Sequence, residues 1–188
     1  AMTTLYVVAT PVGNLEDITL RAIRILKEVD RVLCEDTRVT KKLLTHYDIH
    51  TPVMSYHAHS KMQKVEAIME LLRQGKNLAL VSDAGTPAIS DPGSLLVSQV
   101  REFSKKESIP VDIVGIVGPS ALTGALSVSG LPTSDFLFLG FLPHKKGRET
   151  LFKEIAASVR TVVFYESPHR ILKALESLAK ILEPDRKV

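Results

Sequence analysis

The chain lacks the features that mark several large classes of protein. It has one cysteine, Cys34, and no tryptophan among its 188 residues, and only 5% of the residues are aromatic. A single cysteine forms no internal disulfide, which favours a reducing compartment, so we expect a cytoplasmic protein. No run of about 18 apolar residues occurs, so we predict no transmembrane helix. Because 45% of the residues are hydrophobic but few are aromatic, the core must be largely aliphatic.

Motifs for phosphate and metal are also missing. The segment Thr10-Pro11-Val12-Gly13-Asn14 differs from G-x-G-x-x-G, and no Walker A motif occurs, so a phosphate-bearing cofactor has no dedicated cradle. His57-Ala58-His59 is the nearest approach to a metal motif. A zinc site needs three or four ligands, and the lone Cys34 adds no suitable spacing, so we expect no metal.

The first 128 residues alternate strand and helix patterns, which predicts a mainly parallel, doubly wound α/β domain. We predict helix N-caps at Asp17 and Thr37. The predicted strands are Leu5–Ala9, Arg31–Cys34, Val53–Tyr56, Asn77–Ser82 and Val111–Val114. The predicted helices are Thr19–Glu28, Thr37–Tyr47, Lys61–Gln74, Ser94–Lys106 and Ser120–Val128.

A stretch rich in Gly, Pro, Ser and Asp, residues 129–135, interrupts the alternation and predicts a linker. Beyond it, residues 136–188 predict a second, smaller α/β domain with two strands and two helices. Two strands make a poor independent sheet. We therefore expect this domain to be truncated, either because the chain stops early or because a partner supplies the rest.

The positive charge of the chain lies in its last third. Residues 1–128 carry 14 Lys/Arg and 14 Asp/Glu, whereas residues 129–188 carry 10 Lys/Arg and 7 Asp/Glu. The densest basic cluster contains Lys145, Lys146 and Arg148. Such a cluster attracts phosphate groups, but a solvated surface loop has the same composition.

The most informative segment is Ser82–Gly93, a loop rich in Gly, Pro and Asp that follows a buried apolar strand. It contains no Lys or Arg, so it suits a ligand held by backbone groups and shape, including one with a positive charge near Asp83 or Asp91. Simple turn formation explains the same residues. Loops rich in Gly and Pro also follow the first and fifth strands, and in a parallel sheet all three open at one edge, where ligands bind.

Charged residues follow two further strands. Asp36 and Arg38 form either a local ion pair at a helix start or a substrate-positioning pair. Glu166 and Arg170 face a cleft or begin a helix. No G-x-S-x-G elbow surrounds Ser120, so nucleophilic hydrolysis is not predicted.

Six motifs occur in order along the chain: Leu5–Thr19, Glu35–Arg38, Ser82–Gly93, Gly118–Ala121, Gly140–Pro143 and Phe164–Arg170. Together they resemble the bacterial small-subunit ribosomal RNA methyltransferases that modify the ribose 2′-oxygen of a cytidine in 16S RNA, within the tetrapyrrole methylase-like family. The resemblance implies a two-domain α/β fold, S-adenosylmethionine (SAM) as methyl donor, and a homodimer that acts on ribosomal RNA or the small subunit. A tetrapyrrole methylase and a non-catalytic RNA-binding module remain alternatives.

The resemblance also implies roles for single residues. For the general base, which a weakly nucleophilic ribose hydroxyl needs, the candidates are Asp36 and Glu166, with His57 third. The residues expected to bind RNA are Arg38, His57, Lys145, Lys146, Arg148 and Arg170. The residues expected to hold SAM are Pro11, Gly13, Asp83, Ala84, Gly85, Thr86, Pro87, Ile89, Ser90, Pro119, Ser120, Ala121 and, from the second domain, Leu142.

Overall fold

The structure, a computed structural model, describes residues 2–188 and divides into two compact units. Unit 1 is the chain up to Ala121, and unit 2 is Leu122–Val188. The division falls at the start of helix α5 (Ala121–Ser129), and the residues expected to form a linker, 129–135, begin where this helix ends. None of the helices in the described chain is long and apolar enough to cross a membrane.

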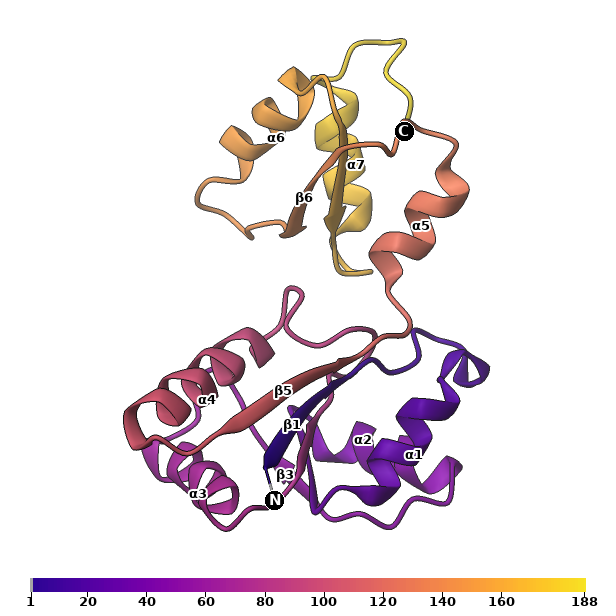
Figure 1. Cartoon of the computed structure of the whole chain (residues 1–188). Helices are drawn as coiled ribbons and strands as arrows, with labels where there is room; N and C mark the ends of the chain where they lie inside the picture. Colours follow the sequence, from indigo (N-terminus) through magenta and orange to yellow (C-terminus); the bar gives the residue numbers. More distant parts are fainter. Residues whose placement is uncertain (1) are drawn as a thin grey trace. The chain divides into compact units, whose positions relative to one another are not determined.

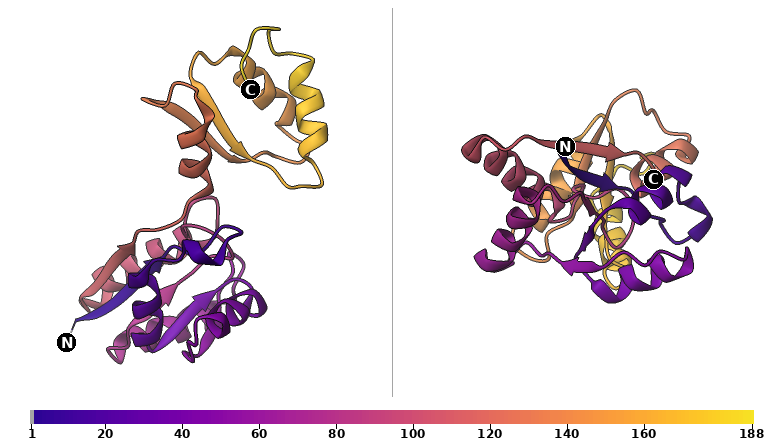
Figure 2. Two further views of the ribbon diagram at one scale, coloured as in Figure 1. Left: turned by 90° about the vertical axis from the view of Figure 1, so that its right-hand side faces the viewer. Right: turned by 60° about the horizontal axis from the view of Figure 1, so that its bottom comes forward.

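A parallel sheet with the strand order β3-β2-β4-β1-β5 forms the middle layer of unit 1. Helices α1 and α2 cover one face and α3 and α4 the other (Figures 1 and 2). The predicted doubly wound sheet is therefore confirmed. The strands are β1 (Thr3–Val8), β2 (Arg31–Cys34), β3 (Val53–Ser55), β4 (Leu78–Leu80) and β5 (Val111–Ile116). The helices are η1, a 3-10 turn (Leu15–Asp17), α1 (Leu20–Glu28), α2 (Thr37–His46), α3 (Met62–Arg73) and α4 (Gly93–Glu107).

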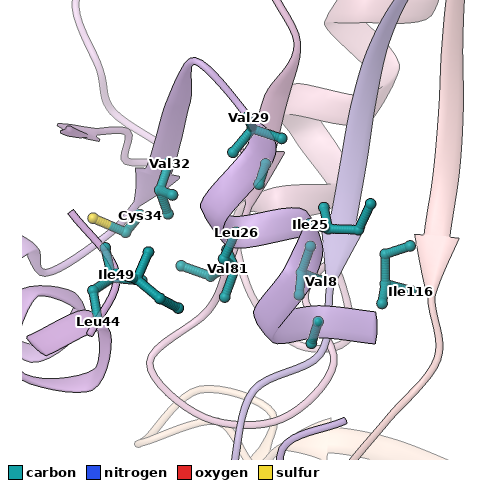
Figure 3. Close-up of a cluster of buried hydrophobic side chains, with 12 residues drawn as sticks. Val8, Ile25, Leu26, Val29, Val32, Cys34, Leu44, Ile49, Val81 and Ile116 are labelled. Carbon is teal, nitrogen blue, oxygen red and sulfur yellow. The ribbon is translucent and has the colours of Figure 1, made fainter. Parts of the chain in front are cut away.

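Successive residues of the inner strands enter two different cores, because side chains alternate across a sheet. On β2, Val32 packs on the α1 and α2 side, whereas Leu33 packs on the α3 and α4 side. Figure 3 shows the first of these cores, where Leu26 of α1 lies among the strand side chains. Each fully buried aliphatic side chain contributes roughly 1.5–3 kcal/mol. A strand covered on both faces is apolar throughout, which explains the uninterrupted Leu78–Val81 segment.

Two helices begin differently from the prediction. Helix α1 is capped by Thr19, whose hydroxyl accepts a hydrogen bond from the Ala22 N–H at 3.0 Å, while Asp17 belongs to η1. Helix α2 is capped by Asp36 rather than by Thr37. In both places two good capping residues lie within two positions of each other, so composition alone did not decide between them.

Unit 2 contains two parallel strands, β6 (Phe136–Phe141) and β7 (Thr161–Tyr165). Besides α5 it has α6 (Arg148–Ala157) and α7 (Ile171–Ala179). Its small core is made by Leu142, Phe152, Ile155, Ala174 and Leu178. The smaller α/β unit expected from the sequence is therefore present.

Candidate functional site

Three loops of unit 1 begin where neighbouring strands end. Strands β4, β1 and β5 are adjacent and parallel, so their carboxyl ends lie at one edge of the sheet. After β1 the chain runs to α1 on one face, and after β4 it runs to α4 on the other face (Figure 1). In open α/β sheets, ligands bind in the crevice where adjacent connections diverge in this way.

The three loops are hydrogen-bonded to one another. Thr10 and Gly85 form an antiparallel bridge with two main-chain hydrogen bonds of 3.0 and 2.9 Å. The Thr86 hydroxyl donates to the carbonyl oxygen of Pro119 at 3.0 Å. The prediction that these loops meet at one edge is therefore confirmed. The residues of unit 1 expected to hold a cofactor lie on these loops or directly after them: Pro11, Gly13, Asp83, Ala84, Gly85, Thr86, Pro87, Ile89, Ser90, Pro119, Ser120 and Ala121.

Two glycines allow the backbone segments to approach closely. Gly85 has a φ of +79°, and a Cβ at this position would lie 3.4 Å from Val12 Cγ2. A Cβ on Gly93 would lie 2.8 Å from Asp91 Oδ1 and 3.0 Å from Ala88 N. A side chain at Gly93 would therefore displace the loop, whereas at Gly85 the left-handed backbone is the main restriction.

The second half of the loop after β4 is held by the Asp91 carboxylate. Asp91 Oδ1 accepts hydrogen bonds from the N–H groups of Ala88 at 2.8 Å and Gly93 at 2.7 Å. Ala88 and Ser90 both have positive φ, +70° and +57°. Such conformations cost about 1–3 kcal/mol in residues other than glycine and persist where the surroundings hold them. Between them, Ile89 is 47% exposed.

Two pockets open at the carboxyl edge of unit 1, and Asp83 lines both. Pocket A, of about 390 Å³, lies between the loop after β1 and α2, and its lining includes Pro11, Gly13, Lys42 and His46. Pocket B, of about 490 Å³, lies where β2 and β3 end. It is lined by Glu35, Asp36, Thr37, Arg38, Ser55, His57 and Asp83. The structure thus brings together four side chains whose roles in catalysis or binding were predicted separately: Asp36, Arg38, His57 and Asp83.

Asp36 is strongly engaged by Arg38. Its carboxylate accepts from the Arg38 side chain at 3.2 and 2.9 Å and from the Arg38 backbone N–H at 2.8 Å. The hydrogen bonds from the Arg38 guanidinium, followed by those from the backbone, lower the pKa of Asp36 to about 2. A carboxylate with so low a pKa is a weak proton acceptor near neutral pH.

The His57 ring also lines pocket B. The backbone N–H of His57 donates to the Ser60 hydroxyl at 2.7 Å, but the ring has no hydrogen-bond partner among residues 2–188. Across these same residues, no three His, Cys, Asp or Glu side chains come together as a metal site. Pocket B is therefore a polar site with three carboxylates, one arginine and one free imidazole.

Glu166 in unit 2 is enclosed by cations. Its side chain is fully buried, and its two oxygens accept from Arg148 and Arg170, each at 3.0 Å. Burial raises the pKa of this carboxyl, but the Ser167 N–H, Arg148 and Arg170 together outweigh burial and lower it. Glu166 has no exposed oxygen with which to take a proton from a substrate. The role of Glu166 as a base therefore stays a prediction, and in this structure its carboxylate anchors two arginines.

The remaining predicted residues of unit 2 divide by exposure. Lys145 and Lys146 are exposed. Arg148 turns inward, where it donates to Glu166 and to the Pro143 carbonyl oxygen at 2.9 Å. Arg170 lies 2.9 Å from His144 Nδ1. Leu142 is 2% exposed and belongs to the core of unit 2, and its backbone N–H donates to the Tyr165 carbonyl oxygen at 3.3 Å.

Sequence reasoning missed several residues of these sites. Glu35 and Ser55 of pocket B were not predicted as site residues, although Glu35 directly follows β2 and Ser55 ends β3 at the same edge of the sheet. Lys42 of pocket A lies four positions after Arg38 on α2, and this spacing places the two residues on one helix face. Asp91 was noted only for its charge.

Comparison with known proteins gives a family match over nearly the whole chain. The model of the Tetrapyrrole (Corrin/Porphyrin) Methylases matches residues 4–188. Solved structures with a similar fold include the uroporphyrin-III-C-methyltransferase of Thermus thermophilus, with a TM-score of 0.62, 20% identity, and coverage of 96% of this chain and 74% of that one. Another is the methyltransferase CobJ, with a TM-score of 0.68, 18% identity, and coverage of 99% and 79%. At these identities, the likeness concerns the fold alone.

Curated relatives are much more similar in sequence. A protein of Halalkalibacterium halodurans named ribosomal RNA small subunit methyltransferase I is 50% identical, over 95% of this chain and 60% of its own length. Proteins of the same name from Thermotoga maritima and Escherichia coli O157:H7 are 48% and 46% identical, each over 98% of this chain, and over 80% and 63% of their own lengths. The chain therefore spans between about three fifths and four fifths of these relatives.

Proposed function

The chain belongs to the tetrapyrrole (corrin/porphyrin) methylase family, and we propose that it is a SAM-dependent methyltransferase acting on small-subunit ribosomal RNA. The observation that carries the proposal is the cluster of three hydrogen-bonded Gly- and Pro-rich loops at one sheet edge. The chain that contains this cluster is up to 50% identical in sequence to relatives named ribosomal RNA small subunit methyltransferase I. The resemblance described above further suggests the ribose 2′-oxygen of a 16S RNA cytidine as the acceptor.

The charge of the loop cluster and its accessible backbone suit SAM. SAM carries no phosphate, and residues 82–93 contain no Lys or Arg to attract one. It is a cation at sulfur, and the exposed Asp83 carboxylate at the junction of both pockets suits a positive charge. The left-handed Gly85 and the tight backbone at Gly93 let main-chain groups approach a ligand. When bound, SAM supplies a methyl group activated for transfer to an oxygen nucleophile.

We propose a different order for the candidate bases. Asp36 has a low pKa and Glu166 is enclosed, so we propose His57 as the group that accepts the hydroxyl proton. Its ring lines pocket B together with Asp83, which links this pocket to the loop cluster. Positioned proton transfer contributes on the order of 10²–10⁴-fold to a rate. Arg38, with 86% of its side chain exposed, would position the RNA at the rim.

We propose that Lys145 and Lys146 contact RNA phosphates, because both are exposed and free to meet them. The side chains of Arg148 and Arg170 are paired with the buried Glu166 carboxylate, so we propose that they hold this part of unit 2 in place and do not contact RNA directly. Phosphate contacts position an RNA without reading its sequence.

On the resemblance alone, we further propose that the whole protein acts in the cytoplasm as a homodimer.

Two measurements test the proposed function. Calorimetric titration of the chain with SAM should show binding, and tritium from labelled SAM should appear in naked small-subunit RNA or in small subunits. A methylated 2′-oxygen cannot attack its neighbouring phosphodiester, so the modified position should resist alkaline cleavage. RNA binding without SAM binding would identify a non-catalytic module instead. Transfer to a tetrapyrrole but not to RNA would identify the other alternative.

A further inference from the structure

We propose that Asp91 is a positioning residue for the methyl donor: its carboxylate holds Ala88–Ser90 in the conformation that presents Ile89 to the ligand. The inference rests on the proposed function, because it assumes that the loop after β4 binds SAM. It assigns to Asp91 a role through other residues, with no contact to the ligand itself.

The two halves of this loop are restrained by different groups. The first half is tied to the neighbouring loops, through the main-chain bridge of Gly85 with Thr10 and the hydroxyl of Thr86 on Pro119. In the second half, the bonds come from within the loop, where Asp91 Oδ1 accepts from two backbone N–H groups. One side chain therefore closes the Ala88–Gly93 turn.

The turn needs this restraint because its backbone is otherwise unfavourable. Ala88 and Ser90 both adopt positive φ, which residues with a Cβ rarely do. The bonds from Asp91 are charge-assisted, which makes them stronger than bonds to a neutral acceptor. Gly93 leaves the space that the carboxylate oxygen occupies, since a Cβ there would lie 2.8 Å from Oδ1. Without the carboxylate, we expect Ala88 and Ser90 to return to ordinary conformations.

Ile89 is the side chain that this turn displays. It is apolar and 47% exposed, although it lies between two residues whose backbone is fixed. An apolar side chain held in solvent at a ligand-binding edge offers a contact surface for the uncharged part of a ligand. Because a turn whose backbone is already fixed loses less freedom on binding than a mobile one, the Asp91 bonds should raise the affinity for SAM.

Titration of the 188-residue chain with SAM tests the inference, using D91N, D91A, I89A and the paired variants. We expect about a tenfold loss of affinity for D91A, the equivalent of 1.4 kcal/mol. D91N keeps an acceptor oxygen without its charge, and we expect roughly a threefold loss, since neutral acceptors bind more weakly. D112A removes an exposed carboxylate on β5, outside the loops, and should leave the affinity unchanged.

A double-mutant cycle distinguishes positioning from general support. If Asp91 acts by presenting Ile89, the loss caused by I89A should largely disappear in the D91A or D91N background, because the two residues are then coupled. Independently of any ligand, amide hydrogen exchange of Ala88 and Gly93 should accelerate in D91A. D91N serves in both measurements if D91A does not fold.

The outcomes separate this inference from the proposed function. Binding by the unaltered chain with equal affinity in D91A, or additive losses in the cycle, would overturn the role of Asp91 and leave the methyltransferase proposal standing. Unchanged exchange at Ala88 and Gly93 would overturn it as well. Absence of SAM binding by the unaltered chain would overturn both together.

Discussion

The three Gly- and Pro-rich loops of unit 1 and the segment around Glu166 in unit 2 are held by different kinds of bond. In unit 1, main-chain groups and hydroxyls join three loops, and the Asp83 carboxylate stays exposed beside two pockets. In unit 2, a buried carboxylate, Glu166, holds two arginines, so its charge is already neutralised. The hydrogen bonds between the loops of unit 1 do not involve the Asp83 carboxylate, so its charge is available to a ligand. In unit 2, the charge of Glu166 is already paired with those of Arg148 and Arg170. We therefore propose that the reacting groups lie in unit 1 and that the Glu166 ion pairs of unit 2 have a supporting role.

Removing the anchor should have the largest effect. E166A leaves Arg148 and Arg170 without their carboxylate partner, and loss of one partner from a buried pair costs about 3–5 kcal/mol. We expect the loss in unit 2, measured by hydrogen exchange in α6 and α7. Unit 1 should keep its exchange rates, which makes it an internal control. Equal destabilisation of both units would contradict the division of roles.

Acid should weaken the same anchor by a smaller amount. The pKa of Glu166 is lowered in the folded chain, so its stabilisation is complete above the unfolded value of 4.5 and is lost as pH falls through the lower folded value. The effect is smaller than that of E166A because a protonated carboxyl still accepts one hydrogen bond. Unfolding of unit 2, followed by exchange between pH 6 and 3, should show this loss.

E166Q provides the control for the acid experiment, since an amide has a similar shape but does not titrate in this range. Its unit 2 should lose less stability between pH 6 and 3 than that of the unaltered chain. If both chains lose stability in parallel, the pH dependence arises from other carboxylates and Glu166 is not the group responsible.

The restraints of the loop after β4 in unit 1 are tested next by G93A. The added Cβ would meet Asp91 Oδ1 at 2.8 Å and Leu80 Cδ2 at 3.0 Å, and crowding of this kind costs about 1–3 kcal/mol. The loop should shift, so the free energy of unfolding of unit 1 and the affinity for SAM should fall together. G124A in α5, where a Cβ meets nothing within 4 Å, is the matched control and should lower neither.

The elements of unit 1 were predictable because their signals are local. Alternation of apolar strands with amphipathic helices sets the parallel order, and parallel strands bring the loops after β1, β4 and β5 to one edge. The role of Asp91 was not predictable, because its bonds to Ala88 and Gly93 depend on the backbone conformation of the turn. A carboxylate in a Gly- and Pro-rich loop is equally typical of a ligand contact.

The environment of Glu166 could not be inferred for a different reason. Glu166 and Arg170 are four residues apart, a spacing that is common at helix starts, but Arg148 approaches from eighteen residues away. Burial of the carboxylate depends on how α6 and β7 pack, which no local pattern records. The same limit applies to Leu142: the resemblance implied a contact with SAM, and no local pattern shows that its side chain packs with α6 and α7 in the core.

The smallest effect is expected from T86V, which removes a single hydroxyl. The Thr86 hydroxyl donates to the Pro119 carbonyl at 3.0 Å, and a bond of this kind contributes about 1 kcal/mol to stability. Valine has nearly the same shape, so the loop after β4 should lose its tie to the loop after β5 without crowding. T86S restores the donor and should restore both the stability and the SAM affinity. Because Thr86 and Asp91 restrain different halves of the loop, the losses of SAM affinity caused by T86V and D91A should be additive in the double variant. A strongly non-additive loss would contradict this, because it would mean that the two halves of the loop are restrained cooperatively.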